Sequence, residues 1–239
     1  MLIFLIVLII MKILALDTST TYGSIAISEG KRIIAEYTLN SIKTHSETLL
    51  SHIDEILKEA ETNINEIKAV VVAIGPGSFT GLRIALSTAK GFCYGQKIPL
   101  IAISTLMSIA NNVAFVNKNI CALLDAGRGQ VYCSVYSSQL DELINPQIFT
   151  LDELTNCINN EVIFVGPFME KLEQKLDTII KVKFRIAPSH HNYPRAASLI
   201  EIVYMKDIKL NYDYQYISNL QPLYIRRTSA EERYKTSRS

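Results

Sequence analysis

The sequence predicts an α/β protein made of two related lobes, of which the second is shorter. Two observations carry this prediction. A strand pair whose first strand ends in aspartate occurs twice, and a strand that runs through Gly-Pro into a helical pattern follows it each time. Apolar residues make up 49% of the 239 residues, which is enough to fill a sizeable core.

The first strand pair is predicted from "ILALDTSTTYGSIAIS", residues 13–28. An apolar strand ends in Asp17, a polar turn with Thr18 and Ser19 follows, and a second strand begins after a glycine. This pattern places a carboxylate and hydroxyl groups in one turn at a strand end. A helix is then expected over about residues 44–61. Its apolar arc consists of Leu49, Leu50, Ile53, Ile56, Leu57 and Ala60.

The segment "AIGPGSFTGLRIAL", residues 73–86, indicates a strand end, a tight turn and the start of a helix. Backbone N–H groups at such a helix start could hold a phosphate, although the segment matches neither the P-loop nor the dinucleotide-binding motif. The alternative is structural, with positive φ at two glycines and close helix packing at Gly81. The candidate phosphate-facing residues here are Gly75, Gly77, Ser78, Thr80 and Arg83.

The second half repeats the first. "CALLDAGRGQVYCSVY", residues 121–136, aligns without a gap on residues 13–28, so that Asp125 corresponds to Asp17. A second Gly-Pro pair, at 166–167, corresponds to the pair at 75–76. The interval between aspartate and Gly-Pro is shorter in the second half, so the second lobe has lost material.

The chain divides into five segments on this reading. The expected boundaries are 12–105 for the first lobe, 106–195 for the shortened second lobe, 196–227 for a C-terminal helix and returning segment, and 228–239 for a charged, mobile tail. Residues 1–11, "MLIFLIVLIIM", are too short to span a membrane and lack the flanks of a signal peptide. We expect an over-extended start, with the mature protein beginning at Met11. The alternative is an extra hydrophobic segment or weak anchor.

Composition argues against a nucleic-acid groove and a metal centre. The net charge is +1 with dispersed cations, so any RNA contact is expected to be indirect. The four cysteines form no CxxC pair, which indicates reduced core residues in a cytosolic protein. His45 and His52 are two helical turns apart, about 10 Å along the axis, which is too far to share one metal ion. We expect both at the rim of the apolar arc, and no metal.

Two α/β lobes that each carry an aspartate-bearing hairpin resemble the actin/Hsp70/sugar-kinase (ASKHA) architecture. In that fold the two turns face each other across a cleft and clasp nucleotide phosphates. A carboxylate there would need a divalent cation between itself and a phosphate. The alternative is that Asp17 and Asp125 each accept hydrogen bonds from the backbone N–H groups of their own turns.

Five motifs in order, "MKILALDTST", "GPGSFTGLRI", "ISTLMSIA", "LLDAGRGQVY" and "QPLYIRR", resemble the TsaB (YeaZ) family over residues 11–227. That family comprises inactive paralogues of TsaD, which transfers a threonylcarbamoyl group to N6 of the adenosine beside the anticodon in tRNAs that read A-starting codons. The resemblance implies a non-catalytic subunit that acts with TsaD and the ATPase TsaE and contacts tRNA indirectly. The isolated chain could form homodimers, and no membrane partner is implied.

The expected interface with TsaD lies on the first two helices. The second helix is apolar or small nearly all round, so something must cover its outer face, and the resemblance implies pairing through these two helices. The alternative is that the helix is fully buried within one chain. Its residues would be His45, Leu49, His52, Ile56, Ile84, Thr88 and Gly91. No cofactor is expected to bind tightly, and ATP or ADP could bind only at a shared interface. Two other functions remain open: a small-molecule kinase of the same fold, and a metallopeptidase-like hydrolase.

Overall fold

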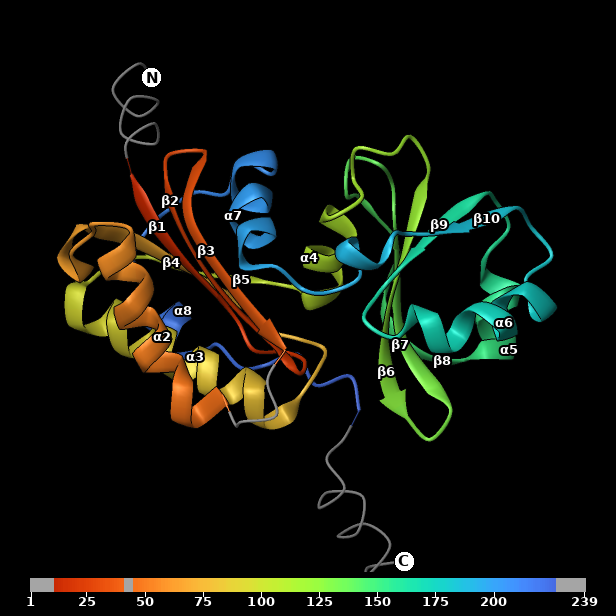
Figure 1. The fold of residues 1–239 in the computed structure, drawn as a ribbon. Coiled ribbons are helices and arrows are strands. Elements are labelled where there is room, and N and C mark those ends of the chain that lie inside the picture. The colour runs from red at the N-terminus through yellow and green to blue at the C-terminus, as the bar shows by residue number, and fades with distance from the viewer. Residues whose placement is uncertain (1–10, 41–44, 227–239) are drawn as a thin grey trace, which may run out of the picture.

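Two five-stranded sheets stand side by side, and each forms the centre of one lobe (Figure 1). The structure is a computed structural model that describes residues 11–40 and 45–226, with the backbone alone for residues 45–47. The expectations for residues 1–10, for the last residue of the predicted segment 196–227 and for the tail 228–239 therefore lie outside the described residues.

The first sheet has the strand order β3-β2-β1-β4-β5. β1 pairs antiparallel with β2 and parallel with β4, and both β1 and β4 are apolar runs buried almost throughout. The strands are β1 (Lys12–Asp17), β2 (Tyr22–Glu29), β3 (Arg32–Asn40), β4 (Ile67–Ala73) and β5 (Leu100–Ile103). The outer face of this sheet is covered by α2 (His45–Glu59) and α3 (Phe79–Gln96) (Figure 1).

The second sheet repeats this topology with the order β10-β9-β6-β7-β8. β6 pairs antiparallel with β7 and parallel with β9, as β1 does with β2 and β4. The strands are β6 (Asn119–Gly127), β7 (Gln130–Tyr136), β8 (Glu142–Thr150), β9 (Val162–Val165) and β10 (Phe184–Ile186), and the outer helices are α5 (Leu151–Cys157) and α6 (Met169–Ile179). The predicted two-lobed duplication is confirmed. The shortening lies partly in α5, which has 7 residues where α2 has 15.

The helix that follows the last strand of each sheet packs on the sheet of the other lobe. α4 (Thr105–Asn111) follows β5 but packs on β6 and β7, whereas α7 (Ala196–Met205) follows β10 but packs on β1 and β2. The two helices also pack on each other between the sheets (Figure 1). One hydrophobic cluster therefore contains residues of both lobes.

One residue of the predicted apolar arc of α2 is not buried. Leu49, Ile53 and Ile56 are buried, as the arc predicts, whereas Leu50 is 64% exposed. Leu50 is turned by about 100° from Leu49 around the helix axis, which takes it beyond the arc that the sheet covers. α2 also ends at Glu59, two residues before the predicted end.

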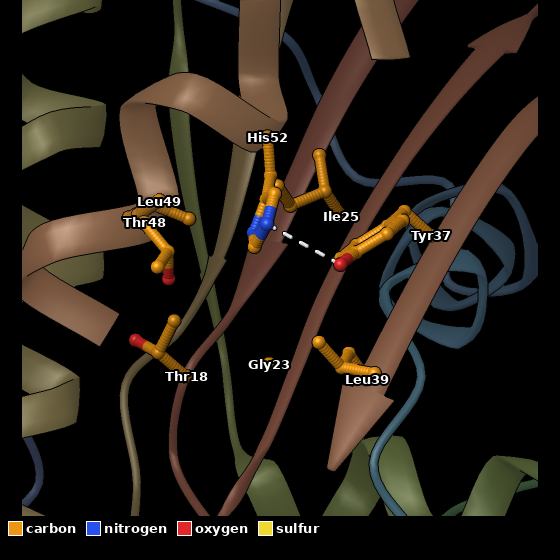
Figure 2. A pocket seen from close by; sticks show the side chains of 8 residues that line it. All are labelled: Thr18, Gly23, Ile25, Tyr37, Leu39, Thr48, Leu49 and His52. Atoms are coloured by element: carbon orange, nitrogen blue, oxygen red, sulfur yellow. Dashed lines mark hydrogen bonds between the residues drawn. The ribbon is translucent and has the colours of Figure 1, made fainter. Parts of the chain in front are cut away.

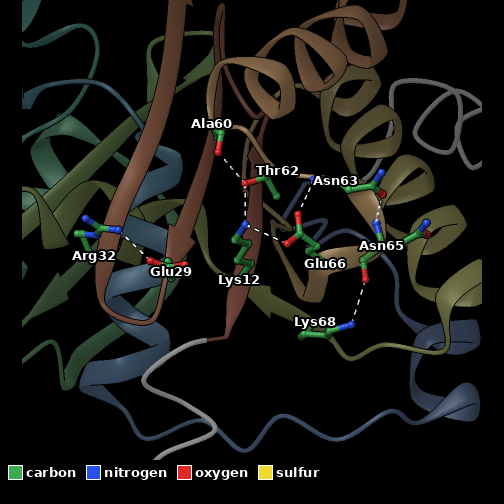
Figure 3. A network of polar contacts seen from close by, with 9 residues as sticks. All are labelled: Lys12, Glu29, Arg32, Ala60, Thr62, Asn63, Asn65, Glu66 and Lys68. Carbon is green, nitrogen blue, oxygen red and sulfur yellow. Dashed lines mark hydrogen bonds and ion pairs between the residues drawn. The ribbon is translucent and has the colours of Figure 1, made fainter.

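A polar network fixes the connection between α2 and β4 (Figure 3). Lys12 at the start of β1 donates to Thr62 Oγ1 at 3.1 Å and pairs with Glu66 at 3.4 Å. Glu66 closes a short 3-10 turn, Ile64–Glu66, by accepting from the backbone N–H of Asn63 at 2.7 Å. That bond is the main reason why the pKa of Glu66 is lowered. The network ties the entry of β4 to the entry of β1, its parallel neighbour.

The cysteines are free thiols, as predicted: Cys93, Cys121 and Cys133 are buried and Cys157 is half-buried. The remaining elements are a 3-10 turn, Ser189–His191, and α8 (Tyr214–Asn219). Within residues 11–40 and 45–226, no helix combines the length and apolarity that crossing a membrane requires.

Candidate functional site: the paired turns

The β1–β2 turn and the Gly-Pro loop before α3 lie directly against each other. The N–H group of Ser78 donates to the carbonyl oxygen of Ser19 at 2.6 Å. From the other side, Thr18 Oγ1 donates to the carbonyl oxygen of Gly81 at 2.7 Å. The two segments that the sequence marks as phosphate-facing are thus brought together, and they form hydrogen bonds with each other.

Two glycines permit this close approach. A Cβ atom on Gly77 would lie 2.3 Å from the carbonyl oxygen of Ser19, and one on Gly81 would lie 1.9 Å from that of Thr18. Both distances are shorter than van der Waals contact with backbone allows, so no larger residue fits without displacing the turn. Gly75 has φ of +113°, which side-chain-bearing residues rarely adopt. This geometry fits the structural alternative for the three glycines.

The side chains of the first turn face inward. Asp17, Thr18 and Ser19 are each at most 1% exposed. Asp17 Oδ1 accepts from the N–H of Ser19 at 2.9 Å and from its hydroxyl at 2.5 Å. A carboxylate that accepts hydrogen bonds from its own turn stabilises that turn. Because Asp17 is fully buried, a cation could reach it only if the turn opened.

The first turn of α3 is capped from within. Ser78 is the N-cap, and its Oγ accepts from the N–H of Gly81 at 3.2 Å, while its carbonyl accepts from Leu82 at 2.9 Å. These N–H groups are therefore not available to an anion. Thr80 lies exposed on the surface of the same turn.

The turn of the second lobe repeats the arrangement on the surface. Asp125 is exposed, and its Oδ1 accepts from the N–H of Gly127 at 2.7 Å. A Cβ atom on Gly166 would lie 2.1 Å from the carbonyl oxygen of Leu123, so this glycine also permits a close backbone contact. The duplication thus extends from strand order to the hydrogen bond within each aspartate turn, whereas Gly166 packs on strand β6 and not on the second turn.

Arg83 points away from the turn and stacks on aromatic rings. Its guanidinium carbon lies 3.8 Å from the centroid of the Phe79 ring, and its Nε donates to the hydroxyl of Tyr224 at 2.9 Å. The two rings are 5.1 Å apart. The predicted phosphate-facing arginine is therefore part of an exposed aromatic cluster with the C-terminal segment.

A small groove between α2 and the β2–β3 pair holds His52 (Figure 2). The imidazole Nε2 lies 3.3 Å from the hydroxyl of Tyr37, and the ring centroids are 4.5 Å apart. His52 is half-buried, as a rim position requires. The His45 side chain lies outside the described residues. Among the side chains that the structure describes, His, Cys, Asp and Glu form no group of three that could hold a metal ion.

Two of the expected interface residues lie inside the first lobe. Leu49 and Ile56 are 4% and 5% exposed and belong to the hydrophobic cluster under α2. Because α2 turns these residues toward its own sheet, they do not form an external contact surface, which corrects the expectation. On α3, Ile84 and Thr88 are half-buried, and Gly91 is exposed with no atom within 4 Å of an added Cβ.

The C-terminal segment takes part in the site, which the sequence did not indicate. The N–H of Leu223 donates to the carbonyl oxygen of Ile74 at 2.7 Å, directly before the Gly-Pro loop. Arg226 donates to the carbonyl oxygen of Ala126 in the second turn at 2.5 Å. The motif "QPLYIRR" contains these residues, but no local sequence pattern predicts which part of the fold the C-terminal segment contacts.

Comparisons with known proteins point to one family. The family model described as "TsaD: tRNA N6-adenosine threonylcarbamoyltransferase" matches residues 32–234. The chain is similar to the "tRNA threonylcarbamoyladenosine biosynthesis protein TsaB" of Bacillus subtilis, with 29% identity over 230 residues that cover 94% of this chain and 98% of the relative. The Escherichia coli protein of the same name is 36% identical over 167 residues, which cover 65% of this chain and 71% of the relative.

A solved structure, "YeaZ from Pseudomonas aeruginosa", shares the fold. It has a TM-score of 0.74 at 21% identity and covers 90% of this chain and 99% of its own. Component A of the (R)-2-hydroxyglutaryl-CoA dehydratase from Acidaminococcus fermentans has a TM-score of 0.50 at 13% identity, over 83% of this chain and all of that one.

Proposed function

Since this chain belongs to the TsaB (YeaZ) family, which shares the TsaD family model, we propose that it is a non-catalytic subunit in the synthesis of threonylcarbamoyladenosine in tRNA. The catalytic step would belong to a TsaD-type subunit. That subunit would transfer threonylcarbamoyl from its adenylate, with release of AMP, to N6 of the adenosine beside the anticodon in tRNAs that read A-starting codons. A TsaE-type ATPase would act with both.

The observation that most supports a non-catalytic role is the close packing of the β1–β2 turn on the Gly-Pro loop. A group that works on a substrate must reach it, and Asp17 is fully buried within its own turn. The N–H groups of Ser78 and Gly81 are bonded within the chain. Both features favour a turn that serves the fold.

The same packing also affects whether the isolated chain can bind a nucleotide. At the start of α3 the N–H groups of Ser78, Gly81 and Leu82 are bonded within the chain, so these donors are not offered to a phosphate. We therefore infer that no nucleotide binds it tightly, and that ATP or ADP would bind only at an interface shared with a partner. Cytoplasmic location follows from the proposed work on tRNA.

The outer face of α3 is the proposed contact with the TsaD-type subunit. Gly91 and Gly95 are exposed, and nothing lies within 4 Å of a Cβ added to either. Small residues let a second helix approach closely, and half-buried Ile84 would lose its remaining contact with water. The net charge of +1 favours an indirect contact with tRNA through the complex.

Reconstitution tests this function. The chain is mixed with the TsaD-type and TsaE-type proteins, threonylcarbamoyl-adenylate as the donor, ATP and an unmodified tRNA that reads A-starting codons. Modified adenosine is then measured with and without the chain. We expect modification only when all three proteins are present, and none when TsaD is omitted. Transfer by this chain without TsaD would contradict the proposal, as would full transfer without this chain.

A further inference from the structure

Residues 220–226, here called the C-terminal strap, run from the outer layer of the first lobe to the second lobe (Figure 1). The strap begins where α8 is anchored. Ile217 of α8 is fully buried in the core of the first lobe, and Lys90 of α3 donates to the carbonyl oxygen of Ser218 at 3.0 Å. The start of the strap is therefore fixed to α3.

The middle of the strap lies on the Gly-Pro loop. The N–H of Leu223 donates to the carbonyl oxygen of Ile74 at 2.7 Å. The carbonyl oxygen of Leu223 lies 3.1 Å from the position that a Cβ on Gly75 would take. The next residue, Tyr224, accepts from Arg83 at 2.9 Å. These contacts hold the strap against the turn end of the first sheet.

The end of the strap reaches the second hairpin. The guanidinium of Arg226 donates from Nη1 to the carbonyl oxygen of Ala126 at 2.5 Å and from Nη2 to Oε1 of Gln130. Both acceptors flank the turn between β6 and β7. A planar guanidinium that donates two hydrogen bonds to one turn holds it in a defined orientation.

These contacts place a non-covalent link at the turn end of the molecule. The lobes are also joined through α4 and α7, which pack between the sheets. Just before α7, Arg195 pairs with Glu36 and the ring of Tyr193 stacks on that of Tyr22. Two-lobed proteins open by rotation about such a joint, and the ends far from the joint move furthest. A contact at the turn end therefore resists rotation most effectively.

We propose that the C-terminal strap is a releasable clamp that sets the separation of the two lobes at their hairpin turns. Its grip on the second lobe is polar, through Arg226, and Leu223 and Tyr224 remain 37% and 38% exposed. A link made of a few hydrogen bonds opens and recloses without unfolding either core. This role is independent of the function proposed above.

Spin labels on the two lobes test the clamp. Glu55→Cys on α2 and Glu173→Cys on α6 replace exposed residues, and Cys157→Ser removes the half-buried thiol from the background. Electron-spin distance measurements are made on the full chain with Arg226→Ala. The control is Gln221→Ala, an exposed strap residue.

We expect Arg226→Ala to shift the distance distribution to longer values and to broaden it, and Gln221→Ala to leave it unchanged. Amide exchange at residues 126–130 should rise by about tenfold with Arg226→Ala, because local opening sets the exchange rate. Distances and exchange rates equal to those of the parent protein would overturn the proposal.

A second variant covers the case in which Arg226→Ala does not fold. Gln130→Ala removes the side-chain acceptor of Arg226 Nη2 on the hairpin and leaves the strap itself unchanged. It should broaden the distance distribution in the same sense as Arg226→Ala. A distribution equal to that of the parent protein would also overturn the clamp.

Discussion

Thr18 and Gly81 fix the start of α3 against the first hairpin. Thr18 Oγ1 donates to the carbonyl oxygen of Gly81 at 2.7 Å, and the carbonyl oxygen of Thr18 occupies the space beside the Gly81 Cα, 1.9 Å from where a Cβ would lie. A helix that starts in a loop thus takes its position from a turn 63 residues earlier in the chain.

Gly81→Ala tests this contact. The added methyl group must displace backbone, so we expect the free energy of unfolding to fall by about 1–3 kcal/mol. Urea denaturation followed by circular dichroism measures it. Gly91→Ala on the same helix is the matched control, because it meets no neighbour within 4 Å. It should raise stability by about 0.5–1 kcal/mol through helix propensity. Equal effects from both variants would contradict the packing argument.

The cysteines should differ sharply in reactivity. Burial raises the pKa of Cys93 to about 12, so little thiolate forms near neutral pH. Burial also raises the pKa of Cys121. In the native protein we expect Ellman's reagent to modify Cys157 within minutes, and the other three thiols to react only after denaturation. Rapid reaction of more than one thiol in the native state would contradict this assignment.

His191 should make stability depend on pH. Burial, then the positive charges of His190 and Arg195, lower the pKa of His191 in the folded protein below its usual value of 6.5. As pH falls through that value, the unfolded chain takes up the proton first, so the free energy of unfolding decreases. The decrease ends below the folded-state pKa.

Thermal unfolding between about pH 7.5 and pH 5 measures this effect. His191→Gln removes the titrating group and should flatten the dependence in that range. Parallel curves for the variant and the parent protein would show that His191 does not contribute.

Ile84→Glu should weaken the complex with the TsaD-type subunit. The new charge stays solvated in the free chain, because Ile84 is half-buried, and it would lose water in the complex. We expect a loss of more than about 2 kcal/mol in association, measured by calorimetry, with most of the thermal stability kept. Leu143→Glu, at a 52% exposed position of β8, is the control and should bind normally. Unfolding of the Ile84→Glu chain, or unchanged binding, would refute the proposed interface.

The duplication could be predicted from the sequence because strand patterns and Gly-Pro turns are encoded by residues that are close together in the chain. Asp125 aligns on Asp17 in the sequence, and the strand orders of the two sheets agree with that alignment. Local patterns also separated buried Leu82 and Leu86 from exposed Arg83 on α3. Periodicity reports which side of a helix is apolar, and it does so reliably where one sheet covers that side.

The rest depends on contacts between distant residues. Asp17 could serve a bound cation or stabilise its own turn, and the choice depends on whether the turn is closed by packing against another segment. That packing requires Gly77 and Gly81, which lie more than 50 residues away in the sequence. The prediction of Leu49 and Ile56 as interface residues is wrong, because an apolar arc does not by itself distinguish a face that packs on the protein's own sheet from one that contacts a partner. The contact of Arg226 with Ala126 depends on the fold of the second lobe, and no sequence pattern near Arg226 predicts this contact.

The exchange of α4 and α7 between the lobes also constrains how the chain folds as it leaves the ribosome. The inner face of the first sheet is covered by Leu199, Ile202 and Val203 of α7, all at most 1% exposed. These residues are synthesised after every strand of both sheets. An N-terminal half that emerges first therefore cannot complete its core and must keep an apolar face open until α7 arrives. Nascent chains stalled before residue 196 should consequently bind chaperones, whereas chains stalled after α7 has emerged should not.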